Sequence, residues 1–235
     1  MKLMLGDCLE RMKEIPDGSV DMVLADPPYG TTACKWDSII DIDLMWVQLN
    51  RIIKPNGAIV MTASQPFTSK LISSNYKMFK YSLVWEKEAA SNFLNFKYQF
   101  GKIHEDICVF GLMATSYSKK GNMQYNPQMV NGKAYVCKQG KAGDAIARDE
   151  KTRNNSVVTT NKGDRYPTSV LKFQRDKNKL HPTQKPVALM EYLIKTYTSE
   201  GETVLDFAMG SGTTIVAANN TGRESIGIEK DRKIF

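Results

Sequence analysis

The sequence predicts an α/β protein built on a doubly wound, mostly parallel sheet, and two observations lead to this prediction. Short apolar runs bounded by turn residues recur along the chain, as expected of strands that are buried on both faces of a parallel sheet. Between several of them lie segments whose apolar residues recur every three or four positions, which indicates amphipathic helices. Such alternation is typical of strands joined by crossover helices. The 235 residues, 42% of them hydrophobic, suffice for one such domain and an insertion.

Seven apolar runs are expected to form the strands of this sheet. They are residues 2–5, 20–25, 58–63, 81–86, 105–111, 203–207 and 224–229. The second run leads directly into Asp26-Pro27-Pro28-Tyr29, and the third follows the stop signal at residues 54–57, Lys-Pro-Asn-Gly.

Three segments carry the helical spacing. The first, residues 43–53, is expected to bury a stripe formed by Leu44, Trp46, Val47, Leu49 and Ile53. The second, residues 186–198, is expected to bury Met190, Leu193, Ile194 and Tyr197, with Gly201 as its stop. The third, residues 213–220, is expected to end before Gly222.

Residues 112–180 differ from the rest in charge and composition. They hold 14 Lys and Arg against 5 Asp and Glu, a net charge of +9, whereas the remaining residues hold 18 against 20, a net charge of −2. A polyanion is the natural partner of such a segment, although a solvated surface is the simpler alternative. Because the segment is polar and has few apolar runs, we expect a loop-rich insertion within a domain formed by residues 1–111 and 181–235.

Several classes of protein are disfavoured. No run of about 18 apolar residues predicts a membrane span, and the N-terminus meets charge too early for a signal peptide. The chain has two histidines, which disfavours a histidine-rich metal centre, and we expect no metal cofactor. The four cysteines lie far apart and suit a reduced cytosolic protein; they are Cys8, Cys34, Cys108 and Cys137.

The motif Asp26-Pro27-Pro28-Tyr29 follows a predicted buried strand, at the sheet edge where ligands of open α/β folds bind. The two prolines stiffen the chain and remove backbone donors, which leaves the Asp26 carboxylate and the Pro27 carbonyl as acceptors. Acceptors aimed at the two N–H bonds of a base amine would stabilise the charge that develops as the nitrogen attacks. A base flipped out of a duplex could stack on Tyr29. An ordinary turn is the alternative interpretation.

A second motif, residues 206–214, combines small residues with a predicted strand-to-helix turn. It reads Asp206, Phe207, Ala208, Met209, Gly210, Ser211, Gly212, Thr213 and Thr214. Glycines there let a ligand approach the backbone at a helix N-terminus. The motif lacks the Gly-Lys-Ser/Thr of a phosphate-binding loop and the full dinucleotide fingerprint, which favours a smaller nucleoside ligand. Glu229, 19 residues after Gly210, could accept hydrogen bonds from ribose hydroxyls. A tight turn followed by a surface glutamate is the alternative.

A third motif, His181-Pro182-Thr183-Gln184-Lys185-Pro186, enters the helix expected at 186–198. Thr183 could cap this helix, and Pro186 suits its first turn. Lys185 could pair with a ligand carboxylate. Simple capping is the alternative for this motif.

Taken in order, these motifs resemble the DNA amino-methyltransferases of the permuted β class, the N4/N6 methylase family. D-P-P-Y comes first, followed by a basic region, H-P-T-Q-K-P, the glycine loop and G-I-E at 227–229. The resemblance implies a seven-stranded, circularly permuted, Rossmann-like methyltransferase fold that uses S-adenosylmethionine. Residues 2–5 would then form the family's third strand, and residues 203–207 and 224–229 its first and second.

The resemblance also implies roles for individual residues. Asp26, Pro27, Pro28 and Tyr29 would form the catalytic motif, with Asp26 also near the cofactor. Cofactor contacts would come from Asp7, Cys8, Thr183, Lys185, Asp206, Phe207, Ala208, Gly210, Ser211, Gly212, Thr213 and Glu229. Ala208 stands where the family usually has Phe, so the side chain that packs on the cofactor stays open. Thr31, Trp36 and Asp37 match an extension of phage-like members, and residues 105–107 match a family strand.

The function implied by the resemblance is methylation of a DNA base amine. Asp26 favours adenine N6, because members that act on cytosine N4 more often carry Ser at this position; cytosine N4 is the alternative. A DNA-binding module without catalysis, and methylation of RNA or of protein, rank lower. The expected partner is double-stranded DNA, recognised through the basic insertion. A homodimer and a cognate restriction nuclease stay open as partners.

Overall fold

The computed structural model describes residues 1–32, 34, 37–138, 158–177, 184–232 and 234–235. The chain forms two compact units, the first comprising residues 1–126 and 169–235 and the second comprising residues 127–168. The second unit lies within the predicted insertion at 112–180 but is shorter. Residues 112–126 and 169–180 of that segment belong to the first unit.

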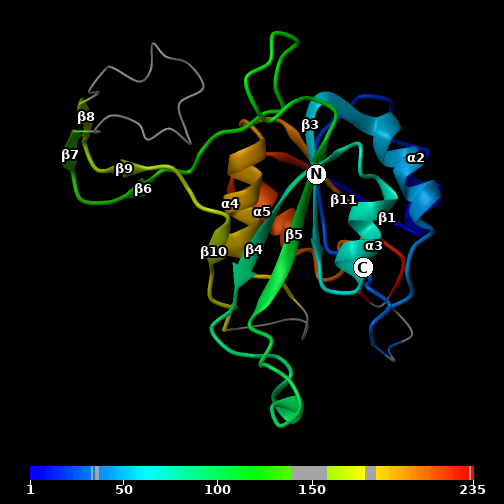
Figure 1. Cartoon of the computed structure of the whole chain (residues 1–235). Coiled ribbons are helices and arrows are strands. Elements are labelled where there is room, and N and C mark those ends of the chain that lie inside the picture. Colours follow the sequence, from blue (N-terminus) through cyan, green and yellow to red (C-terminus); the bar gives the residue numbers. More distant parts are fainter. Residues whose placement is uncertain (33, 35–36, 139–157, 178–183, 233) are drawn as a thin grey trace. The chain divides into compact units, whose positions relative to one another are not determined.

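The first unit is built on an eight-stranded sheet with the order β1-β12-β11-β2-β3-β5-β4-β10 (Figure 1). Its strands are β1 (Lys2–Leu5), β2 (Val20–Ala25), β3 (Ile53–Ala63), β4 (Phe79–Glu86), β5 (His104–Gly111), β10 (Val170–Lys172), β11 (Thr203–Asp206) and β12 (Glu224–Glu229). Neighbouring strands are parallel, except that β5 is antiparallel to both β3 and β4. The seven predicted strands are all present, and β10 adds an eighth beside β4.

The strand order is circularly permuted relative to the chain. β11 and β12 are the last two strands in sequence, yet they lie in the sheet between β1 and β2. Leu3 is in register with Gly227, and Val23 with Leu205. This confirms the predicted permuted arrangement.

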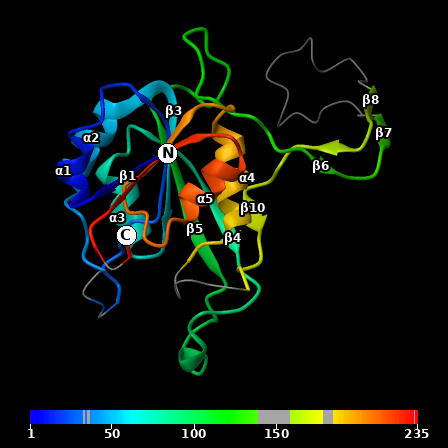
Figure 2. The same ribbon diagram turned by 180° about the vertical axis from the view of Figure 1, so that it is seen from behind.

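Helices cover both faces of the sheet (Figure 2). On one face lie α1 (Cys8–Met12), α2 (Ile42–Ile52) and α3 (Phe67–Ser74), which pack into an apolar cluster that includes Met12, Trp46 and Leu71. On the other face lie α4 (Val187–Tyr197) and α5 (Thr213–Asn220), whose cluster includes Leu193 and Ala217. The result is a three-layer, doubly wound α/β domain, as the alternating patterns predict.

The buried stripe of α4 is confirmed, because Met190, Leu193, Ile194 and Tyr197 are all buried. The stripe predicted for α2 is wrong in part. Leu44 and Val47 are exposed, and the buried residues are Met45, Trp46, Leu49 and Ile52. Asp41 caps this helix by accepting from the Leu44 amide at 3.0 Å, and Ile53 already begins β3. The helix thus presents a face rotated from the predicted one.

The second unit contains two short antiparallel ribbons. β6 (Val130–Asn131) pairs with β9 (Asp164–Arg165), and β7 (Tyr135–Lys138) pairs with β8 (Val158–Asn161). The Arg165 guanidinium lies 4.7 Å from the centre of the Tyr135 ring. Residues 127–168 hold 8 Lys and Arg against 4 Asp and Glu, so this unit carries a net charge of +4. Across the described part of both units, no helix has the length and apolar character needed to span a bilayer.

Candidate active site

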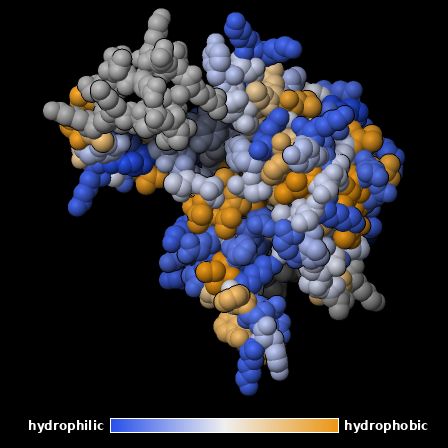
Figure 3. Space-filling view, viewed as in Figure 1, coloured by the Kyte–Doolittle hydropathy of each residue, from blue (hydrophilic) through white to orange (hydrophobic). Residues whose placement is uncertain are grey.

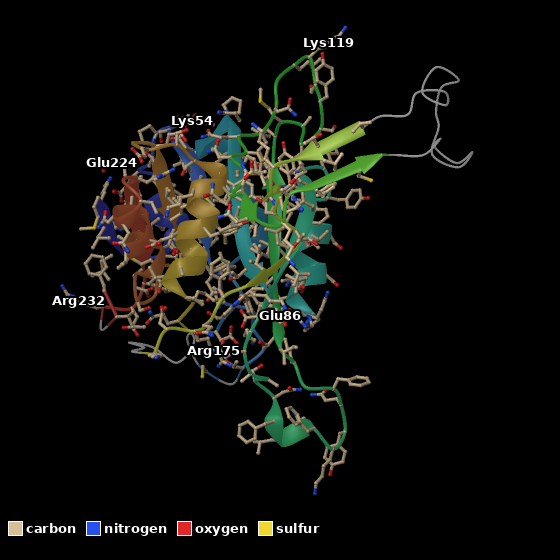
Figure 4. The ribbon with its side chains drawn as sticks, turned by 90° about the vertical axis from the view of Figure 1, so that its left-hand side faces the viewer. Lys54, Glu86, Lys119, Arg175, Glu224 and Arg232 are labelled. Atoms are coloured by element: carbon tan, nitrogen blue, oxygen red, sulfur yellow. The ribbon has the colours of Figure 1, made fainter. Side chains whose placement is uncertain are left out.

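The predicted motifs gather along one edge of the sheet. β1, β12, β11 and β2 are consecutive parallel neighbours, so the residues at their carboxyl ends share an edge. Asp7 follows β1, Glu229 ends β12, Asp206 ends β11 and Asp26 follows β2. In Figure 4, Arg232 and Glu86 lie toward this edge, while Lys54 and Glu224 lie toward the opposite one. The structure therefore brings together residues that lie more than 200 positions apart, such as Asp7 and Glu229.

The carboxylate of Asp26 is held by three donors. Its Oδ1 atom accepts from the Tyr29 hydroxyl at 2.7 Å and from the hydroxyl of Thr62, and its Oδ2 atom accepts from the Lys185 ammonium at 2.6 Å. A carboxylate has about four acceptor positions, so among the described residues one position on Oδ2 stays open. The side chain is 30% exposed. Asp26 is thus fixed in place yet accessible to a donor from a ligand.

Lys185 connects Asp26 to a second carboxylate. Its ammonium lies 3.3 Å from Glu105, and the other Glu105 oxygen lies 3.1 Å from the ammonium of Lys87. Burial alone would lower the pKa of Lys185, but the Asp26 and Glu105 carboxylates outweigh it and raise the pKa above its usual value. The lysine therefore stays charged. In the structure Lys185 thus holds the Asp26 carboxylate, and its pairing with a ligand carboxylate stays a prediction.

The ring of Tyr29 lies against that of Phe67, with 5.4 Å between the centroids and 23° between the planes. Burial, followed by the nearby Asp26 and Glu105 carboxylates, raises the pKa of Tyr29 well above its usual value. The phenol therefore keeps its proton, and its hydroxyl donates a hydrogen bond to Asp26. Pro27 is buried and Pro28 half-buried, which fixes the backbone between the two hydrogen-bonded residues.

The turn after Tyr29 is fixed by Asp37. Its carboxylate accepts from the amides of Gly30, Thr31 and Thr32 at 2.8, 2.9 and 2.7 Å. Burial raises the pKa of Asp37, but hydrogen bonds from Thr32, Gly30 and Thr31 outweigh this effect and lower it. Thr31 and Asp37 of the phage-like extension are thus in contact, whereas Trp36 lies outside the described residues.

The glycine loop leaves open space at the start of α5. Gly210 and Gly212 have φ angles of +50° and +79°, and a Cβ atom added to either would meet no described heavy atom within 4 Å. The Gly210 amide donates to Glu229 Oε2 at 2.9 Å. Gly212 is the N-cap of α5 and provides no side-chain hydrogen bond, so the first amides of the helix are left for other acceptors. The loop is therefore shaped to receive a polar ligand.

Glu229 has acceptor capacity to spare. Besides the Gly210 amide, its carboxylate accepts from the Asp231 amide at 2.7 Å. Two of about four acceptor positions are thus used by the described residues, which leaves room for a pair of hydroxyl donors.

Phe207 and Ala208 occupy different environments. Phe207 is 1% exposed and belongs to the apolar cluster beneath α1–α3, so its side chain is not at the surface of the loop. Ala208 is half-buried, and its amide donates to Asp206 Oδ1 at 3.0 Å. A ligand could reach Phe207 only through its backbone.

Asp7 and Cys8 begin α1 at the far end of the same edge. Asp7 is the N-cap: its Oδ1 accepts from the Leu9 amide at 3.0 Å, and its Oδ2 lies 3.2 Å from the Lys230 ammonium. Cys8 is buried, and burial, followed by the charge of Asp7, raises its pKa to about 11. Its thiol is thus neutral and packs in the core.

The predicted cap Thr183, with His181 and Pro182, lies outside the described residues. In the structure the N-cap of α4 is Pro186, and the amide of Val187 donates to the carboxylate of Asp176 at 3.1 Å. The sequence analysis missed Asp176, and it also missed Thr62, Lys87 and Glu105 as members of the site. For Glu105, the charged residues at the start of the apolar run 105–111 were the available signal.

The carboxylate of Asp206 is expected to make the stability of the fold depend on pH. Burial, helped by the nearby Asp26 and Glu229 charges, raises the pKa of Asp206 to about 7, although hydrogen bonds from Thr214 and Ala208 oppose the shift. An unfolded Asp has a pKa of about 3.9, so the folded state binds more protons between these values. The free energy of unfolding should therefore fall as pH rises from about 4 to 7, by up to about 1.4 kcal/mol per pH unit.

Urea unfolding of the wild type and of Asp206→Asn at several pH values between 5 and 8 measures this effect. The variant keeps a carbonyl acceptor for the Ala208 amide but does not titrate, so its stability should depend less on pH. Parallel pH profiles for the two proteins would contradict the assignment.

Comparisons with known proteins identify the family of this chain. A sequence model of the family described as DNA methylase, N6_N4_Mtase, matches residues 20–235. The DNA adenine methyltransferase YhdJ of Escherichia coli (strain K12) is 28% identical over 237 residues, which cover 95% of this chain and 76% of that protein.

Two solved structures share the fold. The M1.HpyAVI–SAM complex superposes with a TM-score of 0.63 and 24% identity, covering 99% of this chain and 95% of that one. The PvuII DNA methyltransferase (cytosine-N4-specific) superposes with a TM-score of 0.69 and 15% identity, covering 99% of this chain and 82% of that one.

Proposed function

The chain belongs to the N4/N6 DNA methylase family, and from this premise we propose that it transfers the methyl group of S-adenosylmethionine to N6 of adenine in double-stranded DNA. One observation carries the proposal. The Asp26 carboxylate, with one acceptor position open, and the open glycine loop follow adjacent parallel strands, β2 and β11. A base amine at Asp26 would lie beside a methyl donor at the loop, and such proximity supplies much of the rate enhancement when the donor is already activated.

Asp26 is the proposed acceptor for the base amine. An exocyclic amine is a weak nucleophile because its lone pair is delocalised into the ring. A hydrogen bond from one N–H to the open position on Oδ2, and a second from the other N–H to the Pro27 carbonyl, would stabilise the positive charge that develops on the nitrogen. Tyr29, Thr62 and Lys185 hold the carboxylate in place for this contact. Tyr29 is also the proposed aromatic wall for the flipped base.

The groups along the sheet edge beyond Asp26 suit the cofactor S-adenosylmethionine. S-adenosylmethionine supplies a methyl group on a positively charged sulfur. We propose that the open space over Gly210, Ser211 and Gly212 holds it, that the free acceptor positions of Glu229 bind its ribose hydroxyls, and that Asp7 lies near its adenine. Asp206, Ala208 and Thr213 shape the loop. Phe207 and Cys8 can contribute only through their backbones, because both side chains are buried.

Adenine is the preferred target base. Asp26 supports it through the family pattern at this position, and so does the E. coli relative, whose name describes an adenine methyltransferase. Cytosine N4 is the second candidate, since the PvuII enzyme shares the fold and is described as cytosine-N4-specific. Whichever base is the target, the basic residues of segment 112–180 are the proposed DNA contacts of this chain.

Expression in a bacterial host that lacks DNA methyltransferases tests the proposal. Mass analysis of nucleosides from the host DNA should detect N6-methyladenine, and sequencing that records modified bases should place it in one sequence context. An Asp26→Ala protein expressed in parallel is the control for residual host methylation. N4-methylcytosine alone would select the second candidate. Unmodified DNA from cells containing folded protein that binds S-adenosylmethionine would contradict both.

A further inference from the structure

The hairpin that joins β4 to β5 ends in an unusual group of exposed apolar side chains. We call residues 93–100 the hairpin tip; its first three residues form the short helix η1 (Phe93–Asn95). Five of its eight residues are large apolar or aromatic, and each is between 53% and 98% exposed: Phe93, Leu94, Phe96, Tyr98 and Phe100. Apolar side chains gathered on a projection mark an interaction surface more often than chance.

The hairpin tip is ordered by its own hydrogen bonds. The Tyr98 and Gln99 amides donate to the Asn95 carbonyl at 2.9 and 3.0 Å. Below the tip, the Asn92 side chain accepts from the Lys102 amide at 2.6 Å and donates to the Phe100 carbonyl at 3.1 Å. The apolar side chains are therefore presented to solvent by a fixed backbone, so little conformational entropy would be lost when a partner binds them.

The hairpin tip extends from the edge that carries the candidate active site. Because β5 is antiparallel to both β3 and β4, the strand β4 ends at the same edge as β2 and β3. Figure 4 shows Glu86, the last residue of β4, where the hairpin leaves the sheet, and Figure 3 shows the tip as a narrow projection with apolar and hydrophilic residues side by side. Lys87, which follows Glu86, is linked to Asp26 through Glu105 and Lys185.

The chemistry of the hairpin suits DNA. Residues 87–103 contain three lysines and one glutamate, so they carry a net charge of +2. Aromatic side chains stack on bases of any sequence, and cations between them offset the phosphate charge. An enzyme that modifies a base amine must first extrude the base from the duplex, which leaves an unstacked gap that an apolar side chain can fill.

We propose that the hairpin tip is a DNA-docking element whose aromatic side chains stack on the bases left unstacked when the target base leaves the duplex. This rests on the proposed function, because it assumes a substrate base that must be flipped. Tyr98 and Phe100, 86% and 98% exposed, are the proposed stacking residues. Phe96 and Ala90 both lie close to Gly101, so Phe96 suits a residue that supports the tip.

A paired substitution tests the proposal. Tyr98→Ala/Phe100→Ala should lower kcat/KM for methylation of unmethylated plasmid DNA by roughly 5- to 150-fold, the loss expected for one stacked base. Calorimetric binding of S-adenosylmethionine and the unfolding midpoint should stay unchanged, because both side chains are exposed. Phe100→Trp should keep the activity, since indole also stacks. Tyr76→Ala is the matched control: Tyr76 is 77% exposed and precedes Phe79, at the end of β4 opposite the hairpin.

A second measurement separates this proposal from the proposed function. Anisotropy of a labelled duplex containing one abasic site should show weaker binding by the alanine pair than by Tyr76→Ala, whether or not the wild type methylates DNA. Absence of methylation by the wild type would contradict the proposed function alone. Equal binding and equal methylation by the pair and the control would overturn the docking role of the tip. Conversion of a wild-type dimer to a monomer by the pair would also overturn it, and would assign the tip to a second copy of this chain.

Discussion

Replacing Asp26 with Ala is expected to abolish methyl transfer while leaving S-adenosylmethionine binding nearly intact. The substitution removes the proposed acceptor for the base amine, and loss of one preorganised polar group in an active site typically lowers kcat by about 100- to 1000-fold. The glycine loop is hydrogen-bonded to Glu229 rather than to Asp26, so the proposed cofactor site should keep its structure in the Asp26→Ala protein. Transfer of a radiolabelled methyl group to DNA measures the first effect, and calorimetry with S-adenosylmethionine measures the second.

Glu229→Ala is the matched control for this experiment. It also removes a partly buried carboxylate at the same edge, but the one proposed to bind the cofactor ribose. It should weaken S-adenosylmethionine binding and raise its KM, with a smaller effect on kcat. Full activity of Asp26→Ala, or the same loss of cofactor binding in both variants, would remove Asp26 from the proposed role.

Replacing Lys185 with Met is expected to destabilise the fold by about 3–5 kcal/mol. The ammonium is the cation shared by Asp26 and Glu105, and its side chain is only 8% exposed, so its loss leaves two carboxylates close together with less compensation. Urea unfolding at neutral pH measures the change. Methyl transfer should fall as well, because Asp26 loses one of its three donors.

Two further variants test whether the buried ion pairs of Lys185 cause this destabilisation. Lys230→Met removes a lysine that also pairs with a carboxylate, that of Asp7 at 3.2 Å, but its side chain is 77% exposed, so the expected change is about 1 kcal/mol or less. Adding Glu105→Gln to Lys185→Met should restore part of the lost stability by removing one unpaired charge. Equal destabilisation by the Lys185 and Lys230 substitutions would show that the buried ion pairs are not the cause.

The positions of the strands and helices along the chain could be predicted from the sequence, because they depend on local patterns. The apolar runs at 20–25 and 224–229 coincide with β2 and β12, and the helix at 213–220 coincides with α5. The permuted order was implied by the resemblance to the N4/N6 methylase family, which rests on the order of the motifs. The α2 stripe was harder, since several apolar residues allow two neighbouring faces and the choice depends on how the helix packs.

The ion pairs around Asp26 could not be predicted in the same way. Lys185 lies 159 positions from Asp26, and no local spacing reports which carboxylate a distant ammonium will approach. The burial of Phe207, in contrast, had a signal. Side chains alternate along β11, so Leu205 and Phe207 point to the same face, and both belong to the same apolar cluster. The ordinary alternation of a strand therefore assigns Phe207 to the core.

The placement of β11 and β12 between β1 and β2 has a consequence for biosynthesis. β1 is made first, but its hydrogen-bonding neighbour in the sheet is β12, whose residues follow more than 200 positions later. During synthesis the nascent chain can therefore form only an incomplete sheet. In this sheet β1 and one side of β2 stay unpaired until residues 203–229 emerge from the ribosome. Pairings of such long sequence separation form slowly and expose strand edges meanwhile. The unpaired edges of β1 and β2 should accordingly be open to pairing with other chains until β11 and β12 join the sheet.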